Sequence, residues 1–253
     1  MVSHDEMRAA LGDAVAHGDA TFSMADRLCQ ACVDLLSVDG AAISLTLEGA
    51  THGTMGSSSE LSRLLDEFQF TYGEGPCLEA VRSGSPVMIE DLRDASEERW
   101  PAYTEAASRL GVRAVFSLPV CAANSYIGAL DLYRNSPGPL LGDALLGGLL
   151  AAELALLPVL GLMSMDAGVG PLADGSSAWD HLSQLSRVEV YQATGMLIAQ
   201  LDVTPAEALV RLRAHAFAND LTASQVAWAI IERKLMLESD RDSWAGSGSG
   251  EAS

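Results

Sequence analysis

The stretch from Arg187 to Leu235 contains three amphipathic segments separated by helix-start signals. In the first segment, apolar or small residues recur at the spacing of one helical face: Val190, Ala193, Leu197 and Leu201. The second and third segments begin with Thr204 and Thr222, followed three residues later by Glu207 and Gln225, and both pairs predict a capping box. Because helices this short are not stable alone, the pattern predicts three helices that pack together.

This segment resembles the ANTAR domain, the small RNA-binding module of bacterial transcription-antitermination regulators. The resemblance is carried by Gln192–Leu197, Glu207–Leu209, Leu212–Ala216 and Val226–Ala227. It implies that the module binds structured RNA, namely hairpin loops in nascent transcripts, whose unpaired bases are accessible to a small helical reader. The RNA-binding residues that we expect are Arg187, Gln192, Ala193, Thr194, Gly195, Arg211, Arg213 and His215.

Charge limits how this module can bind RNA. Between Trp179 and Trp244 there are six basic and nine acidic residues, so phosphate contacts require a local patch. Arg187 and Arg211 are the candidates for it, whereas Arg213 either joins the patch or is a half-buried structural residue. Many ANTAR domains carry Lys where this chain has Thr194, which removes one cation.

Gly195 lies in the middle of the first predicted helix, where it costs about 1 kcal/mol relative to Ala. A glycine in such a position usually permits close approach of a neighbour. Two interpretations remain open: the neighbour is either another helix or the RNA.

The whole chain of 253 residues has a formal net charge of −19, which disfavours non-specific attachment to nucleic acids or anionic membranes. Its hydrophobic content of 49% is sufficient for a real core. Four scattered cysteines and no secretory leader at the start of the sequence lead us to expect a reduced, cytoplasmic setting.

The N-terminal half alternates between predicted helices and strands. We expect helix up to about Leu36, a strand over Ala41–Leu47, and a Gly/Ser/Thr-rich loop near Gly53–Ser59. A helix over Glu60–Phe68 then precedes three strands, Val87–Ile89, Val112–Val120 and Tyr126–Leu132. Helices on both sides of a run of strands predict an α+β sandwich.

This half resembles the GAF domain, a sensor fold found together with ANTAR in bacterial regulators. The residues that carry the resemblance are Tyr72–Ala80, Ile89–Leu92, Arg99–Pro101, Gly111–Arg113, Ser117–Pro119 and Ile127–Tyr133. The resemblance implies a pocket for a small-molecule ligand, which we expect to be lined by Tyr72, Gly75, Pro76, Cys77 and Phe116. The NKFDE motif of cyclic-nucleotide GAF domains is absent, which argues against that ligand class.

The Gly73–Cys77 segment lacks the spacing and the lysine of a phosphate-binding loop. It is either a structural turn or part of a pocket wall. Cys29 and Cys32 fall on an apolar helix face and are expected to be buried thiols, whereas Cys77 at a predicted helix start remains a candidate redox sensor. The five histidines form no ligand spacing, and no nucleophile–base set is visible, so we expect no metal, no cofactor and no enzyme activity.

The apolar run Ala144–Met165 approaches the length of a membrane span, but Glu153 and Pro158 argue for a buried or subunit-facing helix and hence for a homodimer. We therefore expect a sensor domain over 1–160, a linker over 161–178, an RNA-binding domain over 179–242 and a disordered tail over 243–253. The expected function is signal-responsive transcription antitermination. The alternative is a protein-interaction and dimerisation module that does not bind RNA.

Overall fold

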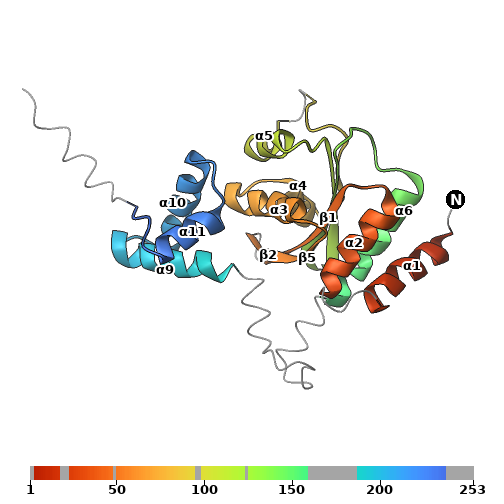
Figure 1. The fold of residues 1–253 in the computed structure, drawn as a ribbon, viewed down its shortest axis with the longest axis horizontal. Coiled ribbons are helices and arrows are strands. Elements are labelled where there is room, and N and C mark those ends of the chain that lie inside the picture. Colours follow the sequence, from red (N-terminus) through yellow and green to blue (C-terminus); the bar gives the residue numbers. More distant parts are fainter. Residues whose placement is uncertain are drawn as a thin grey trace, which may run out of the picture. The chain divides into compact units, whose positions relative to one another are not determined.

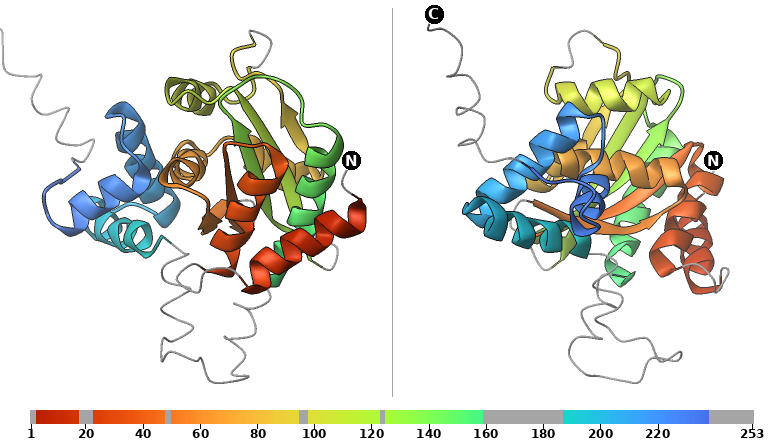
Figure 2. Two further views of the ribbon diagram at one scale, coloured as in Figure 1. Left: turned by 45° about the vertical axis from the view of Figure 1, so that its right-hand side comes forward. Right: turned by 60° about the vertical axis from the view of Figure 1, so that its left-hand side comes forward.

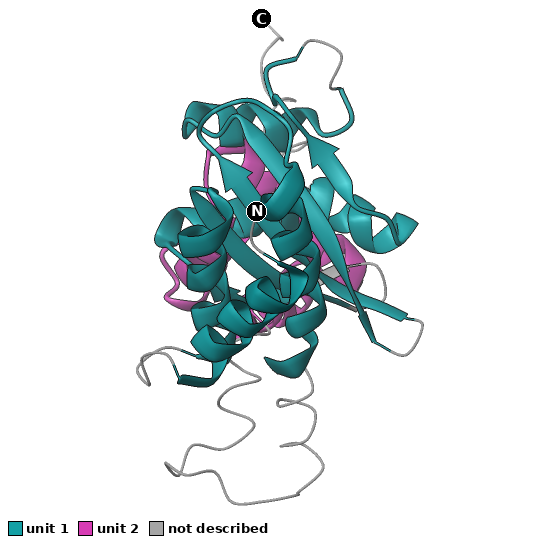
Figure 3. Cartoon of the chain, turned by 90° about the vertical axis from the view of Figure 1, so that its right-hand side faces the viewer, with its two compact units in different colours: residues 1–186 teal, residues 187–253 magenta. Residues whose placement is uncertain are grey.

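The computed structural model describes residues 3–17, 23–47, 50–94, 98–122, 125–158 and 187–237. The chain divides into two compact units, residues 1–186 and residues 187–253 (Figure 3). The predicted linker over 161–178 and tail over 243–253 lie outside the described residues.

A five-stranded antiparallel sheet organises the first unit (Figure 1). Its strands are β1 (Gly40–Leu47), β2 (Ala50–Ser57), β3 (Val87–Ile89), β4 (Ala114–Ala122) and β5 (Ser125–Arg134). Their order across the sheet is β2-β1-β5-β4-β3, and the long β4–β5 hairpin pairs Phe116 with Leu132 and Ser117 with Asp131. Because side chains alternate along a strand, adjacent residues of β4 and β5 serve opposite faces of the sheet.

Helices α2 (Met24–Leu36) and α6 (Gly142–Leu154) cover one face of the sheet, and α1 (His4–His17) packs against these two helices (Figure 2). This face is apolar throughout its centre, with a buried core that includes Leu28, Cys29, Cys32, Ile43, Phe116, Leu118, Leu130 and Leu132. The sequence predicted a single N-terminal helix where the structure has two. The signal that marks the second helix is the Ser23–Asp26 pair, which forms a complete capping box at the start of α2.

Helix α6 lies very close to the apolar face because of its two adjacent glycines. A Cβ at Gly147 would lie 2.2 Å from Leu36 Cδ2, and one at Gly148 would lie 2.9 Å from Leu118 Cδ1. The glycines that weaken this helix in isolation therefore allow it to pack tightly. Leu149 and Leu157 remain exposed on the outer side. Within the described part of the chain, no helix combines the length and the apolar character needed to cross a membrane.

The other face of the sheet is covered by α3 (Glu60–Tyr72), α4 (Pro76–Ser83) and, at its margin, α5 (Pro101–Arg109). A second apolar core lies here. Its buried residues are Leu65, Ala80, Val87, Ile89, Leu92, Trp100, Tyr103, Ala107, Val112, Val115 and Tyr133. The strand boundaries predicted for β4 and β5 differ from the observed ones by about two residues, because the sheet continues into the hairpin turn.

The loop predicted near Gly53–Ser59 is wrong, since these residues mostly belong to the edge strand β2. Glycine, serine and threonine are poor indicators of a strand, but β1 supplies the hydrogen-bonding partner and Met55 is buried in the first core. Gly56 also lies against α2, where a Cβ would come within 2.4 Å of the Ala25 backbone.

The second unit consists of α9 (Val188–Leu201), α10 (Pro205–Ala218) and α11 (Ala223–Ile231), as the three-helix prediction required. The buried residues of the bundle are Val190, Ala193, Leu197, Ala208, Leu212, Ala216, Ala223, Val226, Ala227 and Ile230. Thr222 and Gln225 form the complete capping box of α11. At α10 the box is only half formed: Thr204 accepts from the Glu207 N–H, but the Glu207 carboxylate binds Arg211 instead.

Candidate functional sites

The residues predicted to bind RNA do not share one surface of the second unit. Ala193 and Thr194 face the interior of the bundle, and the Thr194 hydroxyl donates to the carbonyl of Val190 at 2.7 Å. In this conformation neither side chain is available to RNA. Gln192 and Gly195 are exposed on α9.

The arginines are less accessible than the sequence suggested. Arg187 is only 6% exposed and takes up left-handed backbone geometry at the start of α9, with φ 44°. Arg213 is half-buried, and its pKa is lowered by desolvation and by the charge of Arg187, while Tyr191 opposes the shift. These observations favour the structural interpretation of Arg213. Arg211 pairs with Glu207 at 2.9 Å, and His215 is half-buried on the same helix.

An uncharged stripe runs along the exposed side of α9. It consists of Val188, Tyr191, Gln192, Gly195 and Ala199, which lie on one helical face by their spacing and are all exposed. No atom outside the helix backbone lies within 4 Å of the position that a Cβ of Gly195 would take. Among the described residues of the second unit, no neighbouring helix packs against Gly195.

The sequence prediction missed other exposed groups of the second unit. Arg233 and Lys234 follow α11 directly and are exposed, and Arg233 has left-handed backbone geometry with φ 58°. Val210, Phe217 and Trp228 are large apolar side chains that are more than half exposed. Each lies opposite the buried face of its helix, so burial periodicity would have identified them.

In the first unit, the Gly73–Cys77 segment ties together three helices. Gly73 ends α3 in left-handed geometry, and Pro76 occupies the first turn of α4. The Glu74 carboxylate accepts from the backbone N–H groups of Ala102 at 2.8 Å and Tyr103 at 3.2 Å, so it caps the start of α5. The segment therefore forms a structural turn, and Gly73, Glu74 and Gly75 also line a surface pocket, so both interpretations hold.

Gln69 on α3 extends this junction to the sheet. Its side-chain carbonyl accepts from the Cys77 N–H at 2.8 Å, and its side-chain N–H₂ donates to Asp131 Oδ2 on β5 at 2.7 Å. Gly75 leaves the space that Gln69 occupies, because a Cβ there would lie 2.4 Å from Gln69 Oε1.

A buried polar cluster with two carboxylates lies beside Gln69, between the sheet and α3–α4. Asp66 accepts hydrogen bonds from the hydroxyls of Ser44 and Thr54. Asp131 accepts one from Ser117 at 2.5 Å in addition to the one from Gln69. Burial raises the pKa of Asp131 to about 7, although the two hydrogen bonds act in the opposite direction, and the charge of Asp66 raises it further.

The residues predicted to line a ligand pocket are divided by the sheet. Cys77 is fully buried beside the polar cluster, and Tyr72 stacks on Phe68 with 5.5 Å between ring centroids. Phe116 lies in the apolar core on the opposite face, since its neighbour Ser117 is the residue of β4 that faces Asp131. Phe116 and Cys77 therefore cannot line one pocket.

Burial also argues against redox sensing by Cys77. Desolvation, followed by the charges of Asp131 and Asp66, raises the pKa of its thiol well above the ordinary value. The thiol therefore stays protonated, and the reactive thiolate is suppressed. Burial likewise raises the pKa of Cys32 to about 12, as expected for a structural thiol.

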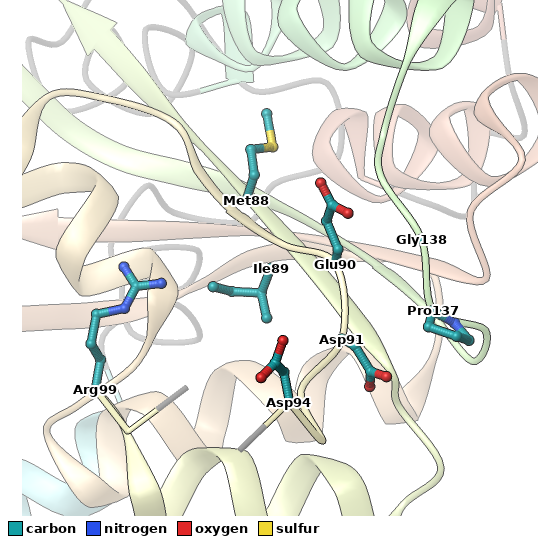
Figure 4. Close-up of a pocket in the computed structure, with 8 residues that line it drawn as sticks. All are labelled: Met88, Ile89, Glu90, Asp91, Asp94, Arg99, Pro137 and Gly138. Atoms are coloured by element: carbon teal, nitrogen blue, oxygen red, sulfur yellow. The ribbon is translucent and has the colours of Figure 1, made fainter. Parts of the chain in front are cut away.

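Two pockets are present at the surface near α5. One of about 580 Å³ is lined by Met88, Ile89, Glu90, Asp91, Asp94, Arg99, Pro137 and Gly138 (Figure 4). The other, of about 260 Å³, is lined by Gly73, Glu74, Gly75, Leu78, Glu79, Arg82, Arg99 and Trp100. Arg99 contributes to both, stacks over Trp100 and pairs with Glu79 at 2.6 Å. Of the predicted pocket residues, Gly75 alone lines either one.

Asp91 is held at the edge of the larger pocket by Arg113, which donates to both of its carboxylate oxygens, at 3.0 and 2.7 Å. The hydrogen bond from Arg113 lowers the pKa of Asp91. Among the residues that the structure describes, no three His, Cys, Asp or Glu side chains are grouped as a metal site would need.

Family models match both units of the chain. The GAF domain model matches residues 23–155, and the ANTAR domain model matches residues 183–231. The chain is a GAF and ANTAR domain-containing protein. No curated protein matches the sequence significantly.

Solved GAF structures resemble the chain only distantly. The GAF domain of an Acinetobacter phosphoenolpyruvate-protein phosphotransferase has 13% identity and a TM-score of 0.49, covering 65% of this chain and 97% of that one. The corresponding domain from Coxiella burnetii has 11% identity and a TM-score of 0.49, covering 65% and 96%. A free methionine-R-sulfoxide reductase from Thermoplasma acidophilum has 15% identity and a TM-score of 0.41, covering 54% and 89%. At these values, none of the three bears on function.

The two domain families define the general class of the protein. GAF domains are associated with signal sensing and ANTAR domains with RNA-binding antitermination regulators, so this combination is typical of a regulator rather than an enzyme.

Proposed function

We propose that this protein is a signal-responsive RNA-binding regulator that acts by transcription antitermination. In this proposal the ANTAR domain binds hairpin loops in nascent RNA and stabilises an antiterminator over a terminator. The observation that carries the proposal is the uncharged stripe on α9, which exposes Gln192 and Gly195 of the ANTAR motif.

The chemistry of the stripe suits the unpaired bases of a loop. The Gln192 amide offers a donor and an acceptor to a base edge, as glutamine does in base recognition. Tyr191, which is 51% exposed, offers a ring on which a base can stack. Gly195 lets the nucleic acid approach the helix backbone closely. Because the domain has a negative net charge, the RNA phosphates are contacted by local cations such as Arg211 and Arg233.

Substitutions of Gly195 test the proposal directly. Gly195→Ala and Gly195→Leu should both stabilise the ANTAR domain, by up to about 1 kcal/mol, because both residues are better helix formers than glycine and the position of a Cβ there is open. Only the leucine should block RNA. We expect Gly195→Leu to weaken binding to a hairpin-loop RNA at least tenfold while Gly195→Ala retains most of the affinity. Unchanged affinity in Gly195→Leu would remove the α9 stripe from the RNA site.

Salt dependence gives a second measure. Arg211→Ala should reduce the slope of log affinity against log salt concentration by about one. Glu207→Ala is the matched control, because it frees the guanidinium from its carboxylate partner and should leave the slope unchanged or steeper.

A protein-interaction role is the second candidate. It is favoured by the large apolar side chains of Val210, Phe217 and Trp228, which are exposed. Exposed apolar side chains are typical of surfaces that bind other proteins. A wild-type protein with no preference for hairpins over unstructured RNA at any salt concentration would favour this candidate.

We further propose that residues 1–160 form the sensor domain, residues 179–242 the RNA-binding domain, and that the protein is a cytoplasmic homodimer with two RNA modules. Exposed Leu149 on α6 and exposed Leu157, which follows α6, support dimerisation. Sedimentation should show twice the chain mass of 26.6 kDa at micromolar concentration. A single species at the monomer mass would contradict it.

A further inference from the structure

The buried cluster beneath α3 and α4 contains two carboxylates on the inner side of the GAF domain. Asp66 is 1% exposed and Asp131 is 7% exposed. The groups that donate to Asp131 are neutral, namely the Ser117 hydroxyl and the Gln69 amide. Ionising a carboxyl group at such a place is costly, and a second carboxylate nearby adds to that cost.

Several neutral groups surround the two carboxylates among the described residues. From β1, β2 and β4 they are the hydroxyls of Ser44, Thr54 and Ser117. From α4 it is the Cys77 thiol, and from α5 and β5 they are the phenols of Tyr103 and Tyr133. The pKa of Tyr103 is raised, first by desolvation and then by Asp131, Cys77 and Asp66, so it stays neutral as well. A proton bound to Asp131 therefore lowers the negative charge of the cluster.

We propose that the GAF domain responds to protons, which bind the buried Asp131 carboxylate and change how the Gln69 bridge holds the start of α4. This inference deepens the proposed sensing function by naming the signal, and it does not depend on RNA binding.

The hydrogen-bond geometry shows how a proton acts here. When Asp131 is ionised, it accepts from both Ser117 and Gln69. A proton on Oδ1 reverses the bond to Ser117, whose hydroxyl oxygen then accepts. The Gln69 N–H₂ still donates to Oδ2, but to a neutral oxygen, and a hydrogen bond to a neutral acceptor is weaker than one to a charged acceptor.

This change in hydrogen bonding is transmitted to the Gly73–Cys77 segment. Gln69 connects Asp131 to the Cys77 N–H at the first turn of α4, and Glu74 in the same segment caps α5. A weaker hydrogen bond between Gln69 and Asp131 therefore affects the starts of both α4 and α5. The change is transmitted through contacts that the described residues already make.

The direction of the pH effect follows from linkage. The pKa of Asp131 is raised in the folded domain, so the folded state binds a proton more tightly than the unfolded chain. The stability that Asp131 contributes is therefore fully present at low pH and is lost as pH rises through about 7. Below that pH, the unfolding equilibrium constant should rise with pH by up to about tenfold per unit, the limit for one proton.

Asp131→Asn mimics the protonated state, because its carboxamide can accept from Gln69 and donate to Ser117. In the full-length protein, we expect the melting temperature of wild type to fall between about pH 5.5 and about pH 8, and that of Asp131→Asn to stay level. The variant should therefore be more stable than wild type at the higher pH. Asp91→Asn, which changes a half-buried carboxylate outside the cluster, is the matched control and should keep the wild-type fall.

Infrared difference spectroscopy keeps the proposal testable if Asp131→Asn does not fold. Wild type should show a protonated-carboxyl C=O band that titrates near neutral pH, and the band should remain in Asp91→Asn. Equal melting profiles for wild type and Asp131→Asn, or no such band in wild type, would overturn the proton response. Hairpin-RNA affinity measured at a single pH tests the proposed function separately, so the two can fail independently.

Discussion

The two faces of the GAF sheet bury chemically different interiors against the same strands. Under α2 and α6 the strands present Phe116, Leu118 and Leu132 to an apolar core. Under α3 and α4 the neighbouring positions Ser117 and Asp131 belong to a network of hydroxyls, an amide and carboxylates. The apolar face holds the domain together by packing that is insensitive to pH. The polar face buries carboxylates, whose charge is stabilised by hydrogen bonds and lowered by proton binding.

The difference teaches where a sensor can be built into a small domain. An apolar core has a single arrangement that solvent conditions scarcely alter, whereas a buried polar network has protonation states of differing energy. The alternation of β4 and β5 lets one hairpin serve both purposes, with one residue for packing next to one for chemistry.

The largest effect should come from the apolar face. Phe116→Ala should lower the free energy of unfolding by about 3–5 kcal/mol, because it leaves a cavity at a fully buried ring. Chemical denaturation would measure the loss. We expect the loss of unfolding free energy to be equal at about pH 5.5 and about pH 8. A strongly pH-dependent loss would contradict the claim that packing on the apolar face is insensitive to pH.

The next largest effect should come from Gln69→Leu on the polar face. It removes the partner of both Asp131 and the Cys77 N–H, which should cost about 2–4 kcal/mol for two buried polar groups. It should also raise the pKa of Asp131, since the hydrogen bond from Gln69 lowers it. Denaturation across the neutral pH range reports both changes. A loss much below 1 kcal/mol would mean that water replaces the amide.

Ser117→Ala should act mainly on the titration. The hydrogen bond from Ser117 lowers the pKa of Asp131, so its removal should move the pH at which stability falls to a value above that of wild type. The destabilisation, about 1 kcal/mol, should be greater at high pH, where Asp131 is ionised and needs the donor. Melting curves at several pH values give the midpoint. A downward shift would be inconsistent with the geometry.

Asp91→Asn should have the smallest effect. The Asp91–Arg113 pair lies at the surface, where solvent screens the interaction. Because the pKa of Asp91 is lowered in the folded protein, its contribution is present at neutral pH and lost on acidification. Its pH dependence is therefore opposite to that of Asp131. Comparison of the two asparagine variants over the same pH range measures the contrast between a surface and a buried carboxylate.

Local patterns in the sequence were sufficient to predict much of the architecture. The Thr222–Gln225 capping box, the apolar spacing of α9 and the alternation of β5 each depend on residues close together in the chain. The edge strand β2 was missed because its residues have weak strand propensity and pair through the partner strand. The start of α2 was missed although its capping residues, Ser23 and Asp26, were visible.

The candidate sites were predicted less well than the fold. On α9 the ANTAR motif was found, but only the packed bundle shows that Gln192 and Gly195 face outward while Ala193 and Thr194 face inward. Adjacent helical residues differ by about 100° in direction, so a motif match alone does not separate the core from the surface.

The sequence by itself determined the two domain families, the three C-terminal helices, two of them capped by threonine, and the apolar cores, because each depends on residue types at short, regular spacings. Only the tertiary structure decided that Gln69 bridges Asp131 and Cys77 and that Phe116 lies across the sheet from Cys77. Gln69 and Asp131 are 62 residues apart in the sequence. Their contact depends on the strand register and on how α3 packs against the sheet. Such long-range pairings have no local signature, since the free energy that selects them comes from burying and satisfying the whole polar layer at once.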